Sequence, residues 1–439
     1  MNRPLFRIAK HALLAAVLAA CALYNDVSIS PLIVQPQQIE KGSDIQSMIR
    51  RSDYLRAMQL ASTIDTKPRR SAVELQSLGQ AELAAGRFDA ARRHLRAALD
   101  LDPFRTAWAT IAWDLAQVEY LSNNCDASLE WAQQASSHGL AIKQWHLEYL
   151  SSLSNKEIYR FSGLPSDRLS MRVGRPDVPR IDVRVNRSKM IPAVVDSGAV
   201  LSIISHRVAD SMPVHRLGDF KGTFYGLLGE PITVEFGLLD SIAIGDIVVE
   251  NVPVAIMPNE KMRFLVSDKK EFNIDFLLGA HLLKEFRLDF DFRHKLVTFT
   301  RLTSADRRPA DDQNLFLDGF RPLVRGTVNG HGWYVFVFDT GSEVTFLNET
   351  QMPTIPGERQ MPKIHSAMLQ GLGGAKKRGT KVENVSIGID KWSGTFRTLP
   401  MYASSDQERG SGIIGENFLE NFRVILDFGR MRVDLIRDH

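Results

Sequence analysis

The sequence predicts a multidomain α + all-β protein, in which an α-helical domain precedes a β domain that contains one folding unit twice. In residues 43–155 apolar residues recur at intervals of three and four, which is the period of an amphipathic helix. In residues 180–437 short alternating or apolar runs are bounded by Gly, Pro and Asn, which is typical of antiparallel strands. Within that β region many features recur in the same order, which indicates a duplicated unit.

Length and composition fit this division. A chain of 439 residues with 44% hydrophobic content can form two or three domains with packed cores. The formal charge is only +3, and Lys and Arg are spread among Asp and Glu, so the chain offers no large positive field. We therefore expect no nucleic-acid partner.

Residues 1–21 read as a signal peptide. Arg3, Arg7 and Lys10 precede an apolar run that is too short to span a bilayer. The run ends in LAAC at Cys21, which resembles the lipobox of bacterial lipoproteins. The resemblance implies an acylated Cys21 that anchors the protein to a membrane on the periplasmic side of a bacterial envelope. The alternative is ordinary signal cleavage beside an incidental cysteine.

The helical domain, residues 43–155, contains one stretch that resembles the tetratricopeptide pattern. Small residues in this pattern allow two antiparallel helices to approach closely, and a proline ends the second helix. Such helix pairs serve either as a docking surface for a partner or as a spacer that supports the next domain, and the sequence leaves both open. The matching positions are Leu78, Gly79, Gly86, Phe88, Ala91, Leu95, Ala98 and Pro103.

The β domain contains the repeat, and its two copies are expected over residues 180–303 and 318–437. Segments 156–179 and 304–317, which are rich in Gly, Pro or charge, are interpreted as linkers. The copies read IPAVVDSGA at 191–199 and WYVFVFDTGS at 333–342, so their aspartates lie 143 positions apart (339 minus 196). Glycine-bearing segments, LLG or IIG triplets and Phe-Arg and Asp-Phe pairs follow in the same order in both copies.

The repeated aspartates indicate an acid/base site. A carboxylate directly after a buried run is costly unless it is paired or hydrogen-bonded, so two such segments suggest that Asp196 and Asp339 meet. The chain contains no His-Glu-x-x-His, Gly-x-Ser-x-Gly or phosphate-loop motif, and no Cys-x-x-Cys pair. We therefore expect neither a metal nor a cofactor.

These residues together resemble the two lobes of a retropepsin-like aspartic protease, fused in one chain as in pepsin-type enzymes. The resemblance implies that Asp196 and Asp339 are catalytic carboxylates in a cleft between the lobes, so that one chain forms the site without dimerising. It implies supporting roles for the residues beside them, in that two glycines let the loops approach and two hydroxyls cross-link them. The supporting residues are Ser197, Gly198, Thr340, Gly341 and Ser342.

The glycine-bearing segments fit the flap hairpins of that family, which close over an extended polypeptide substrate and bind its backbone as an added strand. The alternative is an ordinary glycine turn. The candidate flap residues are Gly226 and Gly229 in the first copy, and Gly371, Gly373 and Gly374 in the second.

The copies differ directly after the glycine, where Ala199 stands against Ser342. If the Ser342 hydroxyl donated to Asp339, it would favour the ionised form, so we expect Asp339 to be the base and Asp196 to carry the shared proton. We expect His281 to be a surface residue at a helix start.

The function that the sequence favours is an aspartic endopeptidase that hydrolyses peptide bonds with a water activated between two aspartates. The rival is a non-catalytic envelope scaffold or peptide-binding protein that uses the helices and a protease-like cleft. Retention of both aspartates, both glycines and both hydroxyls favours the enzyme, because a binding cleft does not need a proton-sharing pair.

Overall fold

The computed structural model describes residues 27–34, 44–50, 53–65, 70–101, 107–172, 178–226, 229–267, 270–356, 364–370, 376–403 and 410–437. The predicted leader with Cys21, the predicted helix terminator Pro103 and the flap glycines Gly371, Gly373 and Gly374 lie outside the described residues. No helix in the described ranges is both long enough and apolar enough to cross a membrane.

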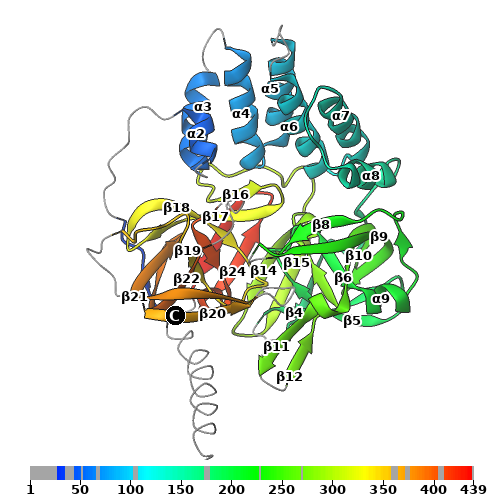
Figure 1. The fold of residues 1–439 in the computed structure, drawn as a ribbon. Coiled ribbons are helices and arrows are strands. Elements are labelled where there is room, and N and C mark those ends of the chain that lie inside the picture. Colours follow the sequence, from blue (N-terminus) through cyan, green and yellow to red (C-terminus); the bar gives the residue numbers. More distant parts are fainter. Residues whose placement is uncertain are drawn as a thin grey trace, which may run out of the picture.

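The helical domain is a row of helices that lies above the β domain in Figure 1. Ser71 and Glu74 begin α4 with a reciprocal capping box. Leu95 of α5 packs closely on Gly79 of α4, because a Cβ added to Gly79 would lie only 2.5 Å from Leu95 Cγ. The helices are α2 (Ile45–Arg50), α3 (Tyr54–Asp65), α4 (Ala72–Ala84), α5 (Phe88–Asp100), α6 (Trp108–Leu121), α7 (Cys125–Ser137) and α8 (Gln144–Leu153).

The first lobe is built on a twisted sheet of order β2-β10-β6-β13-β5-β4-β9-β7, with β8 paired to β9. Alternating burial along β4 shows the one-sided core contact that its Ile-Asp-Val-Arg-Val pattern predicts. The strands are β2 (Arg160–Gly163), β4 (Arg180–Val185), β5 (Met190–Val195), β6 (Ser202–Ser205), β7 (His215–Arg216), β8 (Gly222–Tyr225), β9 (Pro231–Ile244), β10 (Ile247–Met257) and β13 (Phe276–Leu278).

The main path of the second lobe repeats this order, as β1-β22-β19-β23-β18-β17-β21-β20, but its additional strand differs, because β16 pairs with β17, the counterpart of β4, and not with the counterpart of β9. In each lobe the strand before the aspartate pairs in parallel with the strand that ends in the LLG or IIG triplet. The strands are β1 (Val27–Pro31), β16 (Leu315–Asp318), β17 (Arg321–Val328), β18 (His331–Phe338), β19 (Phe346–Asn348), β20 (Ile364–Gln370), β21 (Lys376–Ile389), β22 (Trp392–Tyr402) and β23 (Gly412–Ile414).

Two repeated asparagines fix the hairpins that lead to the aspartates. Asn186 and Asn329 adopt positive φ angles of 46° and 50°, which asparagine tolerates better than most residues. The side-chain oxygen of Asn186 accepts from the Ser241 amide at 3.0 Å, and that of Asn329 accepts from the Ser386 amide at 2.8 Å. The asparagines recur because both lobes use the same turn.

A shared sheet joins the lobes, in the order β25-β24-β14-β15-β3. Its central pair is antiparallel, with Arg287 opposite Asp427 and Asp291 opposite Arg423. These are the positions that the repeat makes equivalent, so the pairing obeys an internal pseudo-twofold axis. The strands are β3 (Ser166–Ser170), β14 (Phe286–Asp291), β15 (Leu296–Arg301), β24 (Arg423–Asp427) and β25 (Arg432–Ile436).

Both predicted linkers are wrong in part, because they contain strands. In segment 156–179, β2 pairs with β10 of the first lobe and β3 pairs with β15 of the shared sheet. In segment 304–317, β16 begins at Leu315 and pairs with β17. A further strand, β1, was not predicted at all and pairs with β22, which is the place that β2 occupies in the other lobe.

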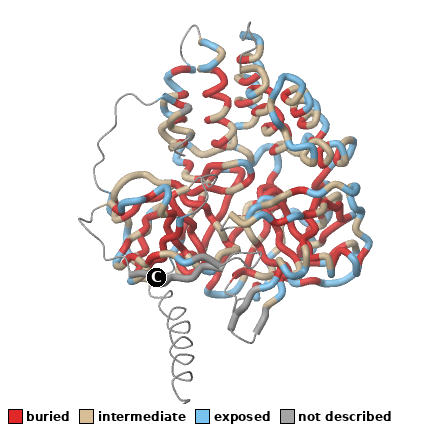
Figure 2. The backbone as a smooth tube through the Cα atoms, in the orientation of Figure 1, coloured by how far each residue is buried: buried red, intermediate tan, exposed pale blue. Residues whose placement is uncertain are grey.

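The helical domain contacts both lobes, and buried residues continue from one domain into the other (Figure 2). On the second lobe Tyr54 of α3 stacks on Phe316, with ring centroids 5.5 Å apart. On the first, the Asn123 side chain accepts from Lys284 Nζ at 2.7 Å and donates to Glu285 at 2.9 Å. The helices therefore span the two lobes as one packed layer.

His281 is fully buried at this junction, so its predicted surface position is wrong. Its ring lies 4.7 Å from Tyr120 of α6 and 4.2 Å from Phe320 of the second lobe, measured between ring centroids. Burial, with the nearby Lys284 charge, lowers the pKa of His281 well below its usual value, so the ring is neutral. The sequence contains no signal that α6 of the helical domain covers this residue.

Candidate active site

Asp196 and Asp339 lie at the ends of equivalent strands and approach each other between the lobes. The Asp196 amide donates to the carbonyl of Leu278 at 3.0 Å, and the Asp339 amide donates to that of Ile414 at 3.1 Å. Each aspartate thus follows a buried strand and is held by the triplet strand beside it. The two carboxyl groups lie in hydrogen-bonding contact with each other.

The two loops are cross-linked by Ser197 and Thr340, both fully buried. The Ser197 amide donates to Thr340 Oγ1, and the Thr340 amide donates to Ser197 Oγ, each at 3.1 Å. Each hydroxyl then donates across the interface to a carbonyl, Ser197 to Phe338 at 2.7 Å and Thr340 to Val195 at 2.6 Å. Serine therefore supplies the same contacts as threonine in this arrangement.

Gly198 and Gly341 let each loop pass beneath the opposite carboxyl group. A Cβ on Gly198 would lie 2.3 Å from Asp339 Cγ, and one on Gly341 would lie 2.4 Å from Asp196 Cγ. Neither glycine can carry a side chain unless Asp196 and Asp339, here called the dyad, move apart.

The surroundings shift the pKa values of the two carboxyl groups to different extents. Burial raises the pKa of Asp196, while the amides of Ala199 and Gly198, each 2.9 Å from its Oδ1, oppose that rise. Burial and then the charge on Asp196 raise the pKa of Asp339 well above its ordinary value, and the amides of Gly341, at 2.8 Å, and Ser342 oppose the rise. These directions favour ionisation of Asp196 and retention of the shared proton on Asp339.

The expectation drawn from Ser342 depended on a hydrogen bond from its hydroxyl to Asp339, and this premise is wrong. The Ser342 hydroxyl donates to the carbonyl of Val344 at 3.0 Å and not to the carboxyl group of Asp339. A serine hydroxyl at this position can donate to a backbone carbonyl of its own loop, and the sequence does not show which acceptor it binds.

The dyad lies in a cleft of about 350 Å³. In the first lobe the cleft extends to Tyr225 and Gly226 at the end of β8, where the Gly226 amide donates to the Glu230 carbonyl at 2.9 Å. Gly229 completes this hairpin with a φ of 82°. The second hairpin is formed by β20 and β21, and its glycines lie outside the described residues.

Sequence reasoning missed several residues that line the cleft. Arg321 contributes a charged side chain from β17, and Phe224, Met257 and Phe346 contribute apolar ones. These residues come from strands far apart in the chain and belong to no repeated motif. Phe224 could have been proposed from its position, because it lies two residues before the flap residue Gly226.

No cluster of three or more His, Cys, Asp or Glu side chains suited to a metal occurs in the part of the chain that the structure describes. Cys125 is buried, and burial raises the pKa of its thiol to about 12.

Comparisons with known proteins agree with the two-lobed arrangement. Residues 181–282 match the family described as aspartyl protease, and residues 319–427 match the family described as retroviral aspartyl protease. These matches support a retropepsin-like aspartic protease with two mostly β lobes, and hence a peptidase. No match to a curated protein was found.

Two solved structures illustrate the similarity. A retropepsin-like aspartic protease from Rickettsia conorii is 20% identical, with a TM-score of 0.22, and the match covers 33% of this chain and 97% of that one. An aspartic proteinase from Irpex lacteus is 11% identical, with a TM-score of 0.35, and the match covers 62% of this chain and 97% of that one.

Proposed function

We propose that the protein is an aspartic endopeptidase in which Asp196 and Asp339 activate a water molecule for attack on a peptide bond. The observation that carries this proposal is the contact between the two carboxyl groups on cross-linked loops at the floor of a cleft. Such a pair keeps one proton between two acids, which supplies a base and an acid in the same site.

The polarity of the dyad assigns the roles. The ionised Asp196 accepts a proton from the water as its oxygen attacks the amide carbon, and the protonated Asp339 donates its proton to the carbonyl oxygen. The resulting gem-diol breaks down when Asp196 passes its proton to the leaving nitrogen and Asp339 regains one from a diol hydroxyl. No covalent acyl-enzyme forms, and the dyad returns to its starting state.

The substrate class follows from the cleft. An extended polypeptide would lie across the dyad, and the β8–β9 hairpin beside Tyr225 would bind its backbone as an added strand. The helices that span both lobes would hold the cleft at a fixed width. Their use as a docking surface for a partner stays a prediction.

The test is cleavage of a diverse peptide pool over a range of pH by the chain that lacks residues 1–21. Asp196→Asn and Asp339→Asn should each abolish cleavage, because an amide can neither accept the proton from water nor share it. Cleavage that survives either substitution would exclude the dyad mechanism. Peptide binding without cleavage by the unsubstituted chain would instead favour the peptide-binding scaffold.

We also propose that acyl chains on Cys21 tether the enzyme to a membrane of a bacterial envelope, on its periplasmic side. The support is the LAAC sequence after the apolar run. Labelled palmitate should enter the expressed protein and should be lost with Cys21→Ser. Incorporation that persists in this variant would overturn the anchor at Cys21.

A further inference from the structure

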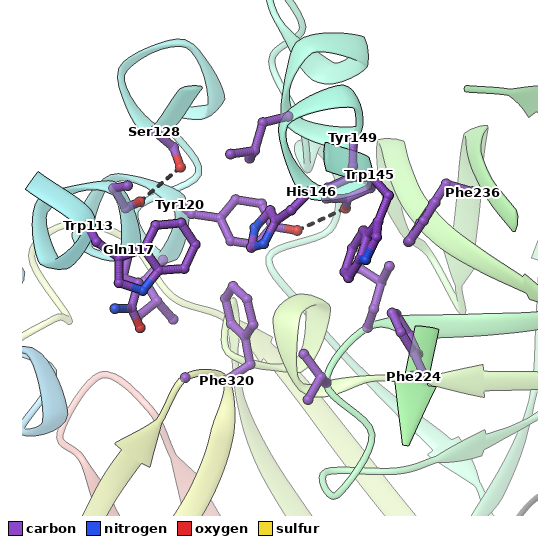
Figure 3. A pocket seen from close by; sticks show the side chains of 16 residues that line it. Trp113, Gln117, Tyr120, Ser128, Trp145, His146, Tyr149, Phe224, Phe236 and Phe320 are labelled. Carbon is purple, nitrogen blue, oxygen red and sulfur yellow. Dashed lines mark hydrogen bonds between the residues drawn. The ribbon is translucent and has the colours of Figure 1, made fainter. Parts of the chain in front are cut away.

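A second cavity, of about 200 Å³, lies between the helical domain and the lobes (Figure 3). Trp113 and Tyr120 of α6, and Trp145 and His146 at the start of α8, lie on its helical side. Phe224 and Phe320, from the first and second lobe respectively, lie on the side of the protease domain. The cavity thus exists only because the helices cover the two lobes.

This cavity adjoins the catalytic cleft. Val200, four residues after Asp196, and Phe224, at the base of the flap, line both spaces. Val200 is 41% exposed, so it is an apolar surface at the boundary between them. A chain that lies in the cleft and continues past these two residues reaches the aromatic cavity.

The chemistry of the lining selects a neutral apolar occupant. Among the described residues that line the cavity there is no Lys, Arg, Asp or Glu, and burial lowers the pKa of His146, which favours an uncharged imidazole. The Tyr120 and Tyr149 hydroxyls bond to each other at 2.8 Å, and the Ser128 hydroxyl donates to the Ala116 carbonyl at 2.9 Å. A carboxylate such as that of a fatty acid would therefore have no cation to pair with in the described part of the lining.

Size and one polar atom favour a polypeptide. A cavity of about 150 Å³ accepts benzene, so this one has room for a phenylalanine or leucine side chain. The indole Nε1–H of Trp145 is buried without an acceptor among the described residues. A main-chain carbonyl beside the inserted side chain would supply that acceptor.

We propose that this cavity is a remote specificity site that receives a large apolar side chain of the polypeptide bound in the cleft. The proposal rests on the proposed endopeptidase function and adds a preference that the helical domain creates. Substrates with Phe or Leu several residues from the scissile bond are bound and cleaved in preference to those with Ala there. Burial of one aromatic side chain predicts a preference of about tenfold to a hundredfold.

The test uses peptides in which a single Phe moves along an otherwise Ala- and Ser-based chain. Cleavage by the active chain is measured beside binding of the same peptides to the Asp339→Asn form by titration calorimetry. We expect one remote position at which Phe is favoured over Ala. Gln117→Trp should fill the cavity and bring that ratio close to one, whereas Gln133→Trp on the exposed side of α7 should preserve it.

A second variant guards against misfolding. Gln117→Glu adds a carboxylate at the lining with little change in volume, and should shift the preference at the same position from Phe toward Lys. Absence of any remote preference, or one unchanged by both Gln117 variants, overturns the specificity site even when the dyad cleaves. Selective binding that responds to Gln117 without any cleavage supports the site and counts against the endopeptidase.

Discussion

Asp196 and Asp339 are equivalent in the repeat but not in their hydrogen bonds. Two amide groups reach Asp196 Oδ1 within 2.9 Å, and one reaches Asp339 Oδ1 at 2.8 Å. The Ser342 amide also lowers the pKa of Asp339, so the two groups differ mainly because the charge on Asp196 raises the pKa of Asp339. The Ser342 hydroxyl donates to the Val344 carbonyl, which explains why this side chain was a poor guide to the pair.

A first prediction concerns pH. Activity needs one proton on the dyad, so it should fall below the lower apparent pKa, where both groups are protonated, and above the upper one, where both are ionised. Because both pKa values are raised, the lower limb should lie above the ordinary aspartate range and the upper limb well above it. Ser342→Ala should leave both limbs of the kcat/KM profile in place; a displaced lower limb would show that this hydroxyl acts on the dyad.

A second prediction concerns the cross-link. Thr340→Val keeps the side-chain shape but leaves the Ser197 amide and the Val195 carbonyl without their partner. Each buried unsatisfied group costs about 1–3 kcal/mol, so a loss of roughly 2–5 kcal/mol in the free energy of unfolding is expected. Denaturant unfolding measures it. Thr340→Ser, which keeps the hydroxyl, is the control and should lose much less; equal losses would mean that packing of the methyl group matters instead.

At the scale of single elements, α6 contains a buried acid. Asp114 accepts from Gln76 at 3.1 Å and from Gln80 at 2.8 Å, both on α4, yet burial raises its pKa to about 6. The pKa of Asp114 is higher in the folded protein than its value of 3.8 in the unfolded chain. Below pH 3.8 the group is therefore protonated in both states and does not reduce the free energy of unfolding. The cost grows as pH rises from 3.8 to about 6 and is complete above that.

The third prediction follows from this pH dependence of stability. Asp114→Asn keeps an acceptor for the two glutamines and removes the charge, so it should stabilise the protein at pH 7.5 by up to about 3 kcal/mol. Thermal unfolding followed by circular dichroism should show this gain shrinking toward zero near pH 4. Asp100→Asn, exposed at the end of α5, should change little at either pH. A gain at pH 7.5 that persists undiminished at pH 4 would exclude titration as its cause.

Elements with a strong local or repeated pattern could be predicted from the sequence, and those defined by distant partners could not. The helices, the paired aspartates and the hydroxyls beside them follow from periodicity and matching offsets. Strands β2 and β3 are short, and three of the four residues of β2 are exposed or polar, so nothing local marks them as strands. Their hydrogen bonds go to β10 and β15, more than 80 positions away.

At the scale of the molecule, the chain passes through the β domain before and after the helices. Strand β1 pairs with β22 of the second lobe, and the chain then forms the helical layer before it enters the first lobe through β2. The sheet of the second lobe therefore contains β1 from the first described segment and β23 from the last, and the chain ends in β24 and β25 of the shared sheet. This arrangement ties the helices to both lobes and keeps the remote cavity next to the cleft.

The fourth prediction tests this connection. Removing residues 1–34 deletes β1, exposes the hydrogen-bonding edge of β22 and uncovers apolar contacts of Val27 and Ile29 with the core. Because each lost backbone hydrogen bond contributes about 0.5–1.5 kcal/mol, the truncated chain should unfold at a clearly lower temperature and tend to aggregate through the free edge. Removing only residues 1–26 keeps β1 and is the matched control. Calorimetry and light scattering compare the two, and equal melting temperatures would show that β1 contributes nothing to the second lobe.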